Sequence, residues 1–371
     1  MKKQHVNYFD YLRILASFCV VYMHVAATPL RGEMGLSWHL TNFFTGIGFI
    51  AVPLFFMMSG YLLLNDERTV DVSVLLKHRI PHLLIPLIAW SGIIMVLYSY
   101  LFKDMSISFY IDESIKILSE PIDVHLWYLY TLIAIYVLSP VIYGGLKNLD
   151  RKGHILVFVL VVLVSVKTML QVVLPNEYAR FLSIDIIDKM SIFSGHLCTF
   201  ILGYYLGNSK KKVPNILLFA LVIVVLGIIT YGTYYLTIKN GAFTQTFHNQ
   251  GSGYHVLLAA LVLLIAKQNL NKPLRWKFLD IKPFVSLSFG IYFIHIPIID
   301  IISRTNIQNN CFKHTAILTV IIYFASFLII KTLATIKPIC YITTGISYEK
   351  ACGSCNWIYT FNKIKNRNNK N

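Results

Sequence analysis

The chain has 371 residues, of which 56% are hydrophobic and only 13% are charged. Soluble globular domains carry about 25% charged residues, so this composition excludes an ordinary soluble protein and predicts an all-α, polytopic integral membrane protein. In a soluble protein the formal net charge of +16 would suggest a nucleic-acid partner. Here we attribute the charge to membrane topology and expect no nucleic acid to bind.

Ten apolar runs are long enough, or nearly long enough, to cross a bilayer. They cover residues 10–28, 42–64, 81–102, 126–144, 154–174, 191–207, 214–236, 254–266, 284–302 and 316–336. The eighth run has only 13 residues, so it should extend into its polar flank GSGYH or tilt into a cavity. We expect a single bundle of about ten transmembrane helices.

No domain boundary is visible, so one membrane domain is expected over residues 1–345, followed by a basic cytoplasmic tail over 346–371. The composition of the end of this tail, NKIKNRNNKN, is typical of a disordered segment that touches anionic lipid headgroups. An even number of helices places both termini on one side of the membrane. On that side lie 22 of the 33 lysines and arginines, against eight on the other side and three within helices. The positive-inside rule then predicts that both termini lie in the cytoplasm.

The first apolar run, DYLRILASFCVVYMH, contains an arginine and a histidine. Arg13 and His24 are eleven residues apart, which is within about 20° of three helical turns, so they share one helix face and lie roughly 16 Å apart along the axis. A guanidinium at membrane depth costs about 2.5–3.5 kcal/mol and by default faces a protein interior or a water-filled cavity. This pattern predicts a polar site that runs outward from the inner leaflet. The alternative is that Arg13 snorkels, that His24 is an interfacial structural histidine, and that Asp10 caps the helix and pairs with Arg13.

Other histidines fall in the half of the membrane that the topology predicts to be outer, or midway across it. They are His125, His196 and His295, with His39 in the first outer loop. An imidazole there suits a general base near neutral pH, although each one taken singly also fits a structural, hydrogen-bonded histidine.

A basic cluster lies on the predicted cytoplasmic side, in the sequence LLKHRIPHLLIP. Lys77, His78, Arg79 and His82 stand at the entrance to the third helix, where they would suit phosphate groups. Flanking charges that only fix topology would look the same. Among the six cysteines only Cys352 and Cys355 form a CxxC, and a lone CxxC predicts a structural or incidental role rather than a metal site.

Four segments together resemble the acyltransferase-3 family of membrane-bound acyltransferases. Arg13 to His24 fits the family's R-x10-H pattern, and YFDYLRILASFCVVYMHV resembles its first helix. VPLFFMMSGYLLL (52–64), HLWYLYTLIAIYVLSPVI (125–142) and SFGIYFIHIP (288–297) resemble its second helix, its fourth helix and a late segment. The match spans most of the chain. Within this family the chain resembles stand-alone surface-polysaccharide O-acetyltransferases of the enterobacterial common antigen type.

The resemblance implies an O-acyltransferase that moves an acyl group, acetyl or succinyl, from cytoplasmic acyl-CoA to a hydroxyl of a surface glycan or its lipid-linked precursor. Acetyl-CoA would be a donor substrate, and no cofactor would be bound permanently. His24 is implied as the base, and Arg13 as a residue that positions the donor or the site. The residues implied to bind substrate or donor are Arg79, His125, Trp127, Ser288, Tyr292 and His295.

The chain departs from the family where an R-x-x-R pair often begins the third helix. Here the matching positions read Arg79, Ile80, Pro81 and His82, so a histidine replaces the second arginine. A function from another class, a transporter or flippase for a lipid-linked glycan, would also use a polar path through ten helices. Consumption of acyl-CoA distinguishes the two functions.

Overall fold

The computed structural model of the chain describes residues 6–102, 106–117, 120–174, 195–271 and 280–368. Helices make up its regular structure, and these residues contain no β-strand, which confirms the predicted all-α class. The chain divides into two compact units where the sequence predicts a single bundle. The first unit comprises Met1–Val70, Ser139–Arg275 and Gln308–Leu318, and the second comprises Asp71–Leu138, Trp276–Ile307 and Thr319–Asn371. Each unit is described by itself.

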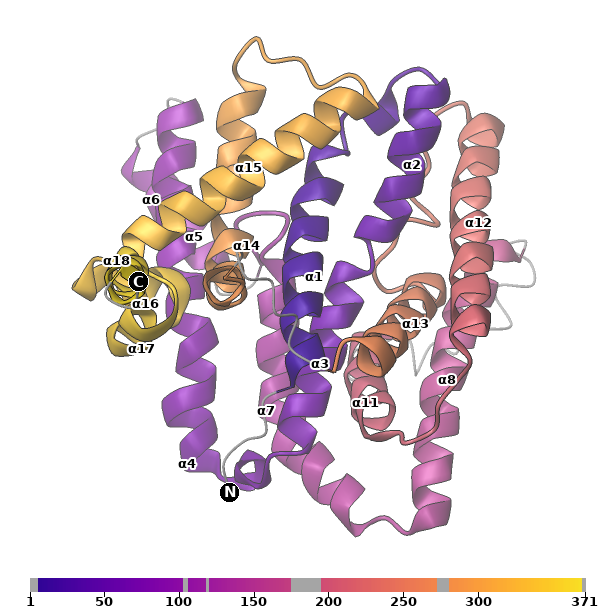
Figure 1. Cartoon of the computed structure of the whole chain (residues 1–371). Coiled ribbons are helices and arrows are strands. Elements are labelled where there is room, and N and C mark those ends of the chain that lie inside the picture. Colours follow the sequence, from indigo (N-terminus) through magenta and orange to yellow (C-terminus); the bar gives the residue numbers. More distant parts are fainter. Residues whose placement is uncertain (1–5, 103–105, 118–119, 175–194, 272–279, 369–371) are drawn as a thin grey trace. The chain divides into compact units, whose positions relative to one another are not determined.

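The first unit is built around α3, which packs against α1, α11 and α13 (Figure 1). Its helices are α1 (Asn7–Val25), α2 (Leu36–Gly48), α3 (Ala51–Leu64), α8 (Arg151–Val173), α11 (Gly195–Asn208), α12 (Asn215–Asn240) and α13 (Gly253–Asn269). Figure 1 shows α2 and α12 side by side, where the Asn42 side-chain amide donates to the Thr230 carbonyl at 2.9 Å.

In the second unit α14 packs against α5, α16 and α17. Its helices are α4 (Val72–Val74), α5 (Ile80–Phe102), α6 (Ile107–Lys116), α14 (Lys282–Ser303), α16 (Lys337–Thr344), α17 (Tyr348–Ser354) and α18 (Trp357–Asn368), with parts of α7 (Trp127–Asn148) and α15 (Phe312–Leu333), which cross between the units. The Trp90 ring stacks on Phe293 of α14 with centroids 5.8 Å apart, and its Nε1 donates to the Thr343 carbonyl at 3.1 Å. One tryptophan thus ties α5 to both α14 and α16.

Each of the ten predicted apolar runs coincides with a helix, although residues 191–194 of the sixth run lie outside the described residues. Among the described residues seven helices are long and apolar enough to cross a membrane, with α2 and α3 together counted as one. The other three predicted runs form α1, α11 and α13. The short eighth run does extend into GSGYH, because α13 begins at Gly253 and the Ser252 side chain caps it by accepting from the His255 amide.

The predicted run 42–64 is a broken helix that starts earlier than expected. α2 begins at Leu36, so His39 lies in a helix and not in the predicted loop, and the chain leaves α-helical geometry at Phe49 and Ile50. Pro53 explains the break, because it has no N–H to donate to the Phe49 carbonyl four residues back and its ring clashes with that carbonyl.

Glycines allow α3 and α11 to pack with their backbones almost in contact. A Cβ placed on Gly60 would lie 1.7 Å from the Phe200 carbonyl oxygen, and one on Gly203 would lie 2.1 Å from the Met57 carbonyl oxygen. Gly203 and Gly207 are spaced as G-x-x-x-G, a pattern that permits close approach of helices in membranes. Side chains at Gly60 and Gly203 would force the two helices apart.

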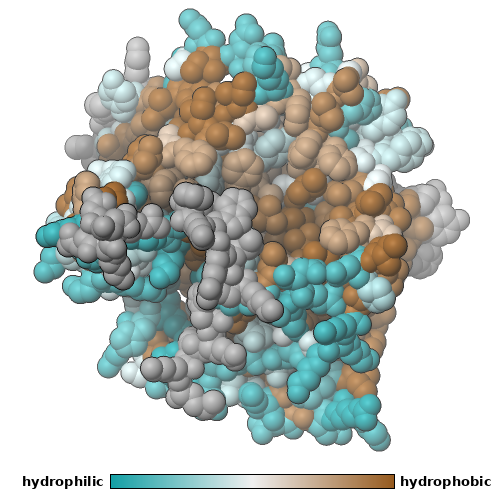
Figure 2. All heavy atoms as spheres, viewed as in Figure 1, coloured by the Kyte–Doolittle hydropathy of each residue, from teal (hydrophilic) through white to brown (hydrophobic). Residues whose placement is uncertain are grey.

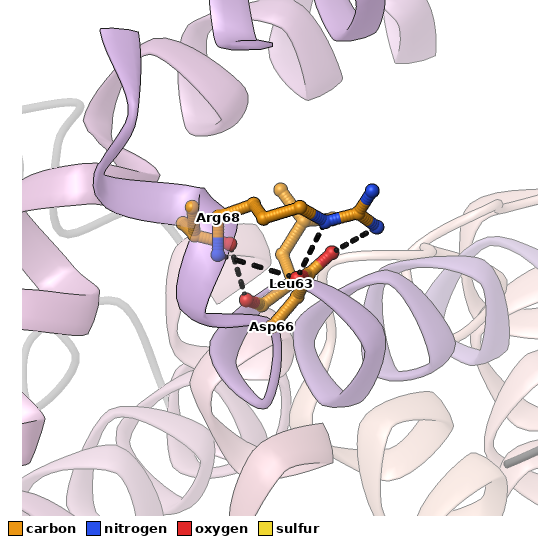
Figure 3. Close-up of polar contacts among 4 residues, drawn as sticks. Leu63, Asp66 and Arg68 are labelled. Carbon is orange, nitrogen blue, oxygen red and sulfur yellow. Dashed lines mark hydrogen bonds and ion pairs between the residues drawn. The ribbon is translucent and has the colours of Figure 1, made fainter. Parts of the chain in front are cut away.

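A compact polar turn follows α3 (Figure 3). The Thr69 hydroxyl donates to the Leu63 carbonyl at 2.6 Å, and the Thr69 amide donates to the Asp66 carbonyl at 2.8 Å. The Arg68 guanidinium donates from Nε and Nη2 to the two carboxylate oxygens of Asp66, at 3.1 and 3.0 Å. Such a paired contact favours one orientation of the planar guanidinium, just after the end of α3.

Apolar side chains remain exposed along the long helices, as expected for surfaces that face lipid. On α12, Ile216, Ile223 and Tyr231 are 81%, 70% and 69% exposed, and their spacing of seven and eight residues places them on one face. Figure 2 shows hydrophobic side chains over much of the surface in that view. These exposed stripes support the predicted integral membrane class.

The C-terminal segment is ordered through Asn368, contrary to the predicted disorder of NKIKNRNNKN, whose last residues 369–371 lie outside the described part. Asp280 accepts hydrogen bonds from the Lys363 ammonium and, at 2.7 Å, from the Tyr359 hydroxyl. Burial opposes the charged form of Asp280, but these donors outweigh it and hold the pKa of Asp280 below its usual range. The Lys331 ammonium lies 4.0 Å from the centre of the Trp357 ring. Tertiary contacts therefore order a helix whose composition alone favours disorder.

Candidate active site

Arg13 and His24 lie on α1, which is one unbroken helix from Asn7 to Val25. Both side chains are half-buried. Because the helix is continuous, their eleven-residue spacing puts them on one face, roughly 16 Å apart along the axis. Asp10 is not the helix cap, because the N-cap is Val6 and Asp10 lies within the first turn. The first unit thus presents a cation and a titratable imidazole at separate levels of one helix.

Two other histidines of the first unit are fully buried, and the sequence analysis did not identify them. His248 Nε2 lies 2.7 Å from the Asn42 side-chain oxygen, and its ring stacks on Phe49 with centroids 5.4 Å apart. Burial, with a smaller effect from His255, lowers the pKa of His248 to about 3. His255 Nδ1 lies 3.1 Å from the Ser252 hydroxyl. The His248 and His255 rings are tilted, with centroids 6.2 Å apart, and His248 joins the loop before α13 to α2 and to Phe49 after it.

The remaining predicted histidines of the first unit pack against aromatic rings. His196 stacks on Phe56 with ring centroids 5.0 Å apart. His39 is exposed on α2, with its ring centroid 5.0 Å from that of Tyr234 and 5.3 Å from that of Trp38.

The second unit brings three predicted site residues together. The ring centroid of His125 lies 5.2 Å from that of His295 and 5.2 Å from that of Tyr292, and both contacts are edge-to-face. The Tyr292 hydroxyl donates a hydrogen bond to the backbone carbonyl of His125. All three side chains are buried. The late segment on α14 and the segment that begins α7 therefore meet in this unit.

Two carboxylates and a tyrosine extend this group, and the sequence analysis did not name them. Asp123 Oδ2 lies 3.5 Å from His125 Nδ1, with the two side chains 3% and 1% exposed. The Tyr98 hydroxyl donates to Asp300 Oδ2 at 2.9 Å. Asp300 lies inside α14, and a carboxylate within an apolar span is itself a signal for a functional residue.

The last predicted site residues occupy the ends and the interior of helices in the second unit. The buried Ser288 hydroxyl donates to the Val285 carbonyl at 2.9 Å. Trp127 is the half-buried first residue of α7, and its ring is edge-on to Tyr128. Arg79 is half-buried and ends a π-helical segment, Leu75–Arg79, that leads into α5.

The π-helical segment has an identifiable cause. Pro81 cannot donate to the Lys77 carbonyl four residues back, and the preceding Ile80 amide instead donates to the Leu75 carbonyl, five residues back. Such local widening recurs at functional sites, and Arg79 is the last residue of this segment. His82, which replaces the family's second arginine, is exposed and its ring stacks on Phe289 with centroids 5.9 Å apart.

Cysteines and metal ligands give no comparable site. All six cysteines are among the described residues and have free thiols, and Cys340 and Cys355 are buried. The Asn356 side-chain amide donates to Cys352 Sγ at 3.3 Å. In the part of the chain that the structure describes, no three His, Cys, Asp or Glu side chains are grouped as a metal site.

One family of known proteins matches most of the chain. No curated protein and no solved structure matches the chain. A family model described as an acyltransferase domain, that of the acyltransferase-3 family, matches residues 6–336. The match covers α1 with Arg13 and His24, the Arg79 segment, and the group formed by His125, Tyr292 and His295. Since this model accounts for most of the chain, the protein belongs to the acyltransferase-3 family of membrane acyltransferases.

Proposed function

We propose that the protein is an O-acyltransferase that moves an acyl group, acetyl in the first instance, from cytoplasmic acyl-CoA to a hydroxyl of a cell-surface glycan or its lipid-linked precursor. The observation that carries this proposal is the arrangement of α1. Within a chain of a membrane acyltransferase family, one continuous helix places a guanidinium and an imidazole on the same face, both half-buried. Transfer of an acyl group to a hydroxyl needs a base for the hydroxyl and a cation for the anionic donor.

In the proposed reaction, His24 accepts the proton of the acceptor hydroxyl. The hydroxyl oxygen forms a bond to the thioester carbonyl carbon, the carbon–sulfur bond breaks, and its electron pair leaves with CoA as a thiolate. The imidazolium of His24 then releases its proton to solvent or to the thiolate. A positioned base contributes about 10² to 10⁴ in rate, so loss of His24 should nearly abolish transfer.

The cations of the chain have separate proposed roles. Arg13 positions the donor or the site from the same face of α1. Arg79, the last residue of the π-helical segment, binds the phosphate groups of acyl-CoA. An arginine suits phosphate because its planar donors form paired hydrogen bonds. We place both termini in the cytoplasm and the protein in a bacterial inner membrane. Acyl-CoA and Arg79 then lie on the same side of the membrane.

Vesicles test the reaction directly. Inverted membrane vesicles that contain the protein receive radiolabelled acetyl-CoA, and label in the glycan fraction is measured beside the abundance of the protein. His24→Gln and His24→Ala should both abolish transfer at normal abundance. His39→Gln is the matched control, since it changes an exposed histidine of the same unit and should keep full transfer. Near-normal transfer by a well-expressed His24→Gln protein would refute the base.

Two further measurements separate the alternatives. Vesicles that move a lipid-linked glycan without consuming acyl-CoA would favour a transporter or flippase. Competition between acetyl-CoA and succinyl-CoA identifies the acyl group.

For topology, a cysteine introduced at Gln245 should react with an impermeant thiol reagent added outside intact cells, and one at Lys211 should react only after the membrane is opened. Both residues are exposed.

A further inference from the structure

The strongest unassigned feature is the turn that precedes α7 in the second unit. Asp123 and His125 stand two residues apart in this turn, which the Leu126 amide closes by donating to the Asp123 carbonyl at 3.0 Å. Asp123 Oδ1 accepts from the Val124 amide at 2.6 Å. This bond fixes the carboxylate, and its second oxygen faces the ring of His125 with Oδ2 3.5 Å from Nδ1.

Both side chains are buried, and their hydrogen bonds are incomplete. Among the described residues, Asp123 Oδ2 and both ring nitrogens of His125 have no partner within hydrogen-bond geometry. Buried polar atoms are nearly always satisfied, so each orphan calls for an explanation. The contact between Oδ2 and Nδ1 needs only a small rotation to become a hydrogen bond, and such bonds often tighten when a ligand binds. Nε2 of His125 would still lack a partner.

The side chains of Tyr98 and Asp300 form a second polar group near the Asp123 carboxylate. The Tyr98 hydroxyl bonds to Asp300, and Tyr98 also interacts with Asp123. Burial opposes the charge of Asp123, but His125, the Val124 amide and Tyr98 outweigh it and keep the pKa of Asp123 below its usual range. Asp123 is therefore an anion, and an anion can only accept a hydrogen bond from the ring beside it.

We propose that Asp123 is a positioning residue that holds the His125 proton on Nδ1, so that Nε2 accepts a hydrogen bond from a hydroxyl of the acyl acceptor other than the one that is acylated. A neutral imidazole donates from one nitrogen and accepts at the other, and a carboxylate at Nδ1 selects which nitrogen does which. The ligand chemistry follows from the acceptor atom, which needs an O–H or N–H donor. Of the two substrates of the proposed function, on which this inference rests, the glycan is the one rich in hydroxyls.

The tautomer can be measured without any substrate. Nitrogen-15 NMR of histidine-labelled protein in detergent shows which ring nitrogen bears the proton, and the signal missing from His125→Gln identifies His125. The wild-type protein should carry the proton on Nδ1. In Asp123→Asn the new amide can donate to Nδ1, so the proton should move to Nε2. Asp280→Asn is the matched control in the same unit and should leave the His125 tautomer unchanged.

Kinetics test the ligand. Asp123→Asn should raise the KM for the glycan acceptor about 3- to 10-fold, the equivalent of one hydrogen bond, with the KM for acyl-CoA unchanged. Asp280→Asn should change neither constant. A proton on Nε2 in the wild-type protein would overturn the role of Asp123, and a rise confined to the acyl-CoA constant would overturn the assignment to the acceptor.

The two proposals fail in different ways. If wild-type vesicles transfer no acyl group, the proposed function fails and the hydroxyl ligand fails with it, while the tautomer measurement still decides the role of Asp123. If wild-type vesicles transfer acyl groups and Asp123→Asn behaves as the wild type in both experiments, the proposed function stands and this inference is wrong.

Discussion

Replacing Gly203 by alanine should separate α3 from α11 and destabilise the first unit. The added Cβ would lie 2.1 Å from the Met57 carbonyl oxygen, whereas ordinary contacts begin near 3.4 Å, so the two backbones must move apart by about 1.3 Å. Overpacking of this kind costs about 1–3 kcal/mol, and backbone atoms cannot rotate away, which favours the upper part of the range. Alanine regains up to about 1 kcal/mol of helix propensity. We therefore expect a net loss of about 1–2 kcal/mol.

Gly227→Ala is the matched control, since Gly227 lies in α12 of the same unit and no heavy atom lies within 4 Å of its added Cβ. This variant should be neutral or more stable by up to about 1 kcal/mol, because only the propensity changes. Unfolding of the two purified proteins by increasing SDS, followed by circular dichroism, gives both free energies. Equal stability of the two variants would show that the close approach of α3 and α11 is not part of the folded protein.

Three other predictions concern charge. Arg79→Ala should raise the KM for acyl-CoA about tenfold or more, as expected for a lost charged hydrogen bond. His82→Ala should leave this KM unchanged, because a neutral imidazole attracts phosphate weakly. If steady-state assays show the reverse order, the two residues exchange their roles. The first unit should lose stability as the pH falls from about 6.5 towards 3, because the folded state keeps His248 neutral while the unfolded chain binds the proton. His248→Gln should flatten that dependence in melting curves. Arg13→Lys should impair transfer strongly, because lysine keeps the charge but loses the planar donors; full transfer by this variant would show that charge alone suffices.

The helices themselves were predictable because an apolar run of bilayer length has few other structures open to it. The early start of α2 and the break before α3 were missed for local reasons. α2 begins in a stretch where polar and apolar residues alternate without a clear period, and the break before α3 could have been predicted from Pro53. The division into two units depends on contacts between distant segments, for which composition holds no signal.

Part of the candidate site could also be predicted from the sequence, and part could not. The common face of Arg13 and His24 follows from helical geometry alone, and the structure retains it. The meeting of His125 with Tyr292 needed the family resemblance, because 167 residues separate them. Asp123 was missed although its signal is local, a carboxylate two residues before a histidine at the edge of an apolar run.

The C-terminal helix bears on how this protein can be shortened or tagged. The family match ends at residue 336, yet Trp357, Tyr359 and Lys363 beyond that point contact Lys331 and Asp280. A gene trimmed to the matched region would leave an ammonium and a carboxylate without these partners, and burial of an unpartnered charge is costly. Fluorescent reporters and affinity tags therefore belong after Asn368.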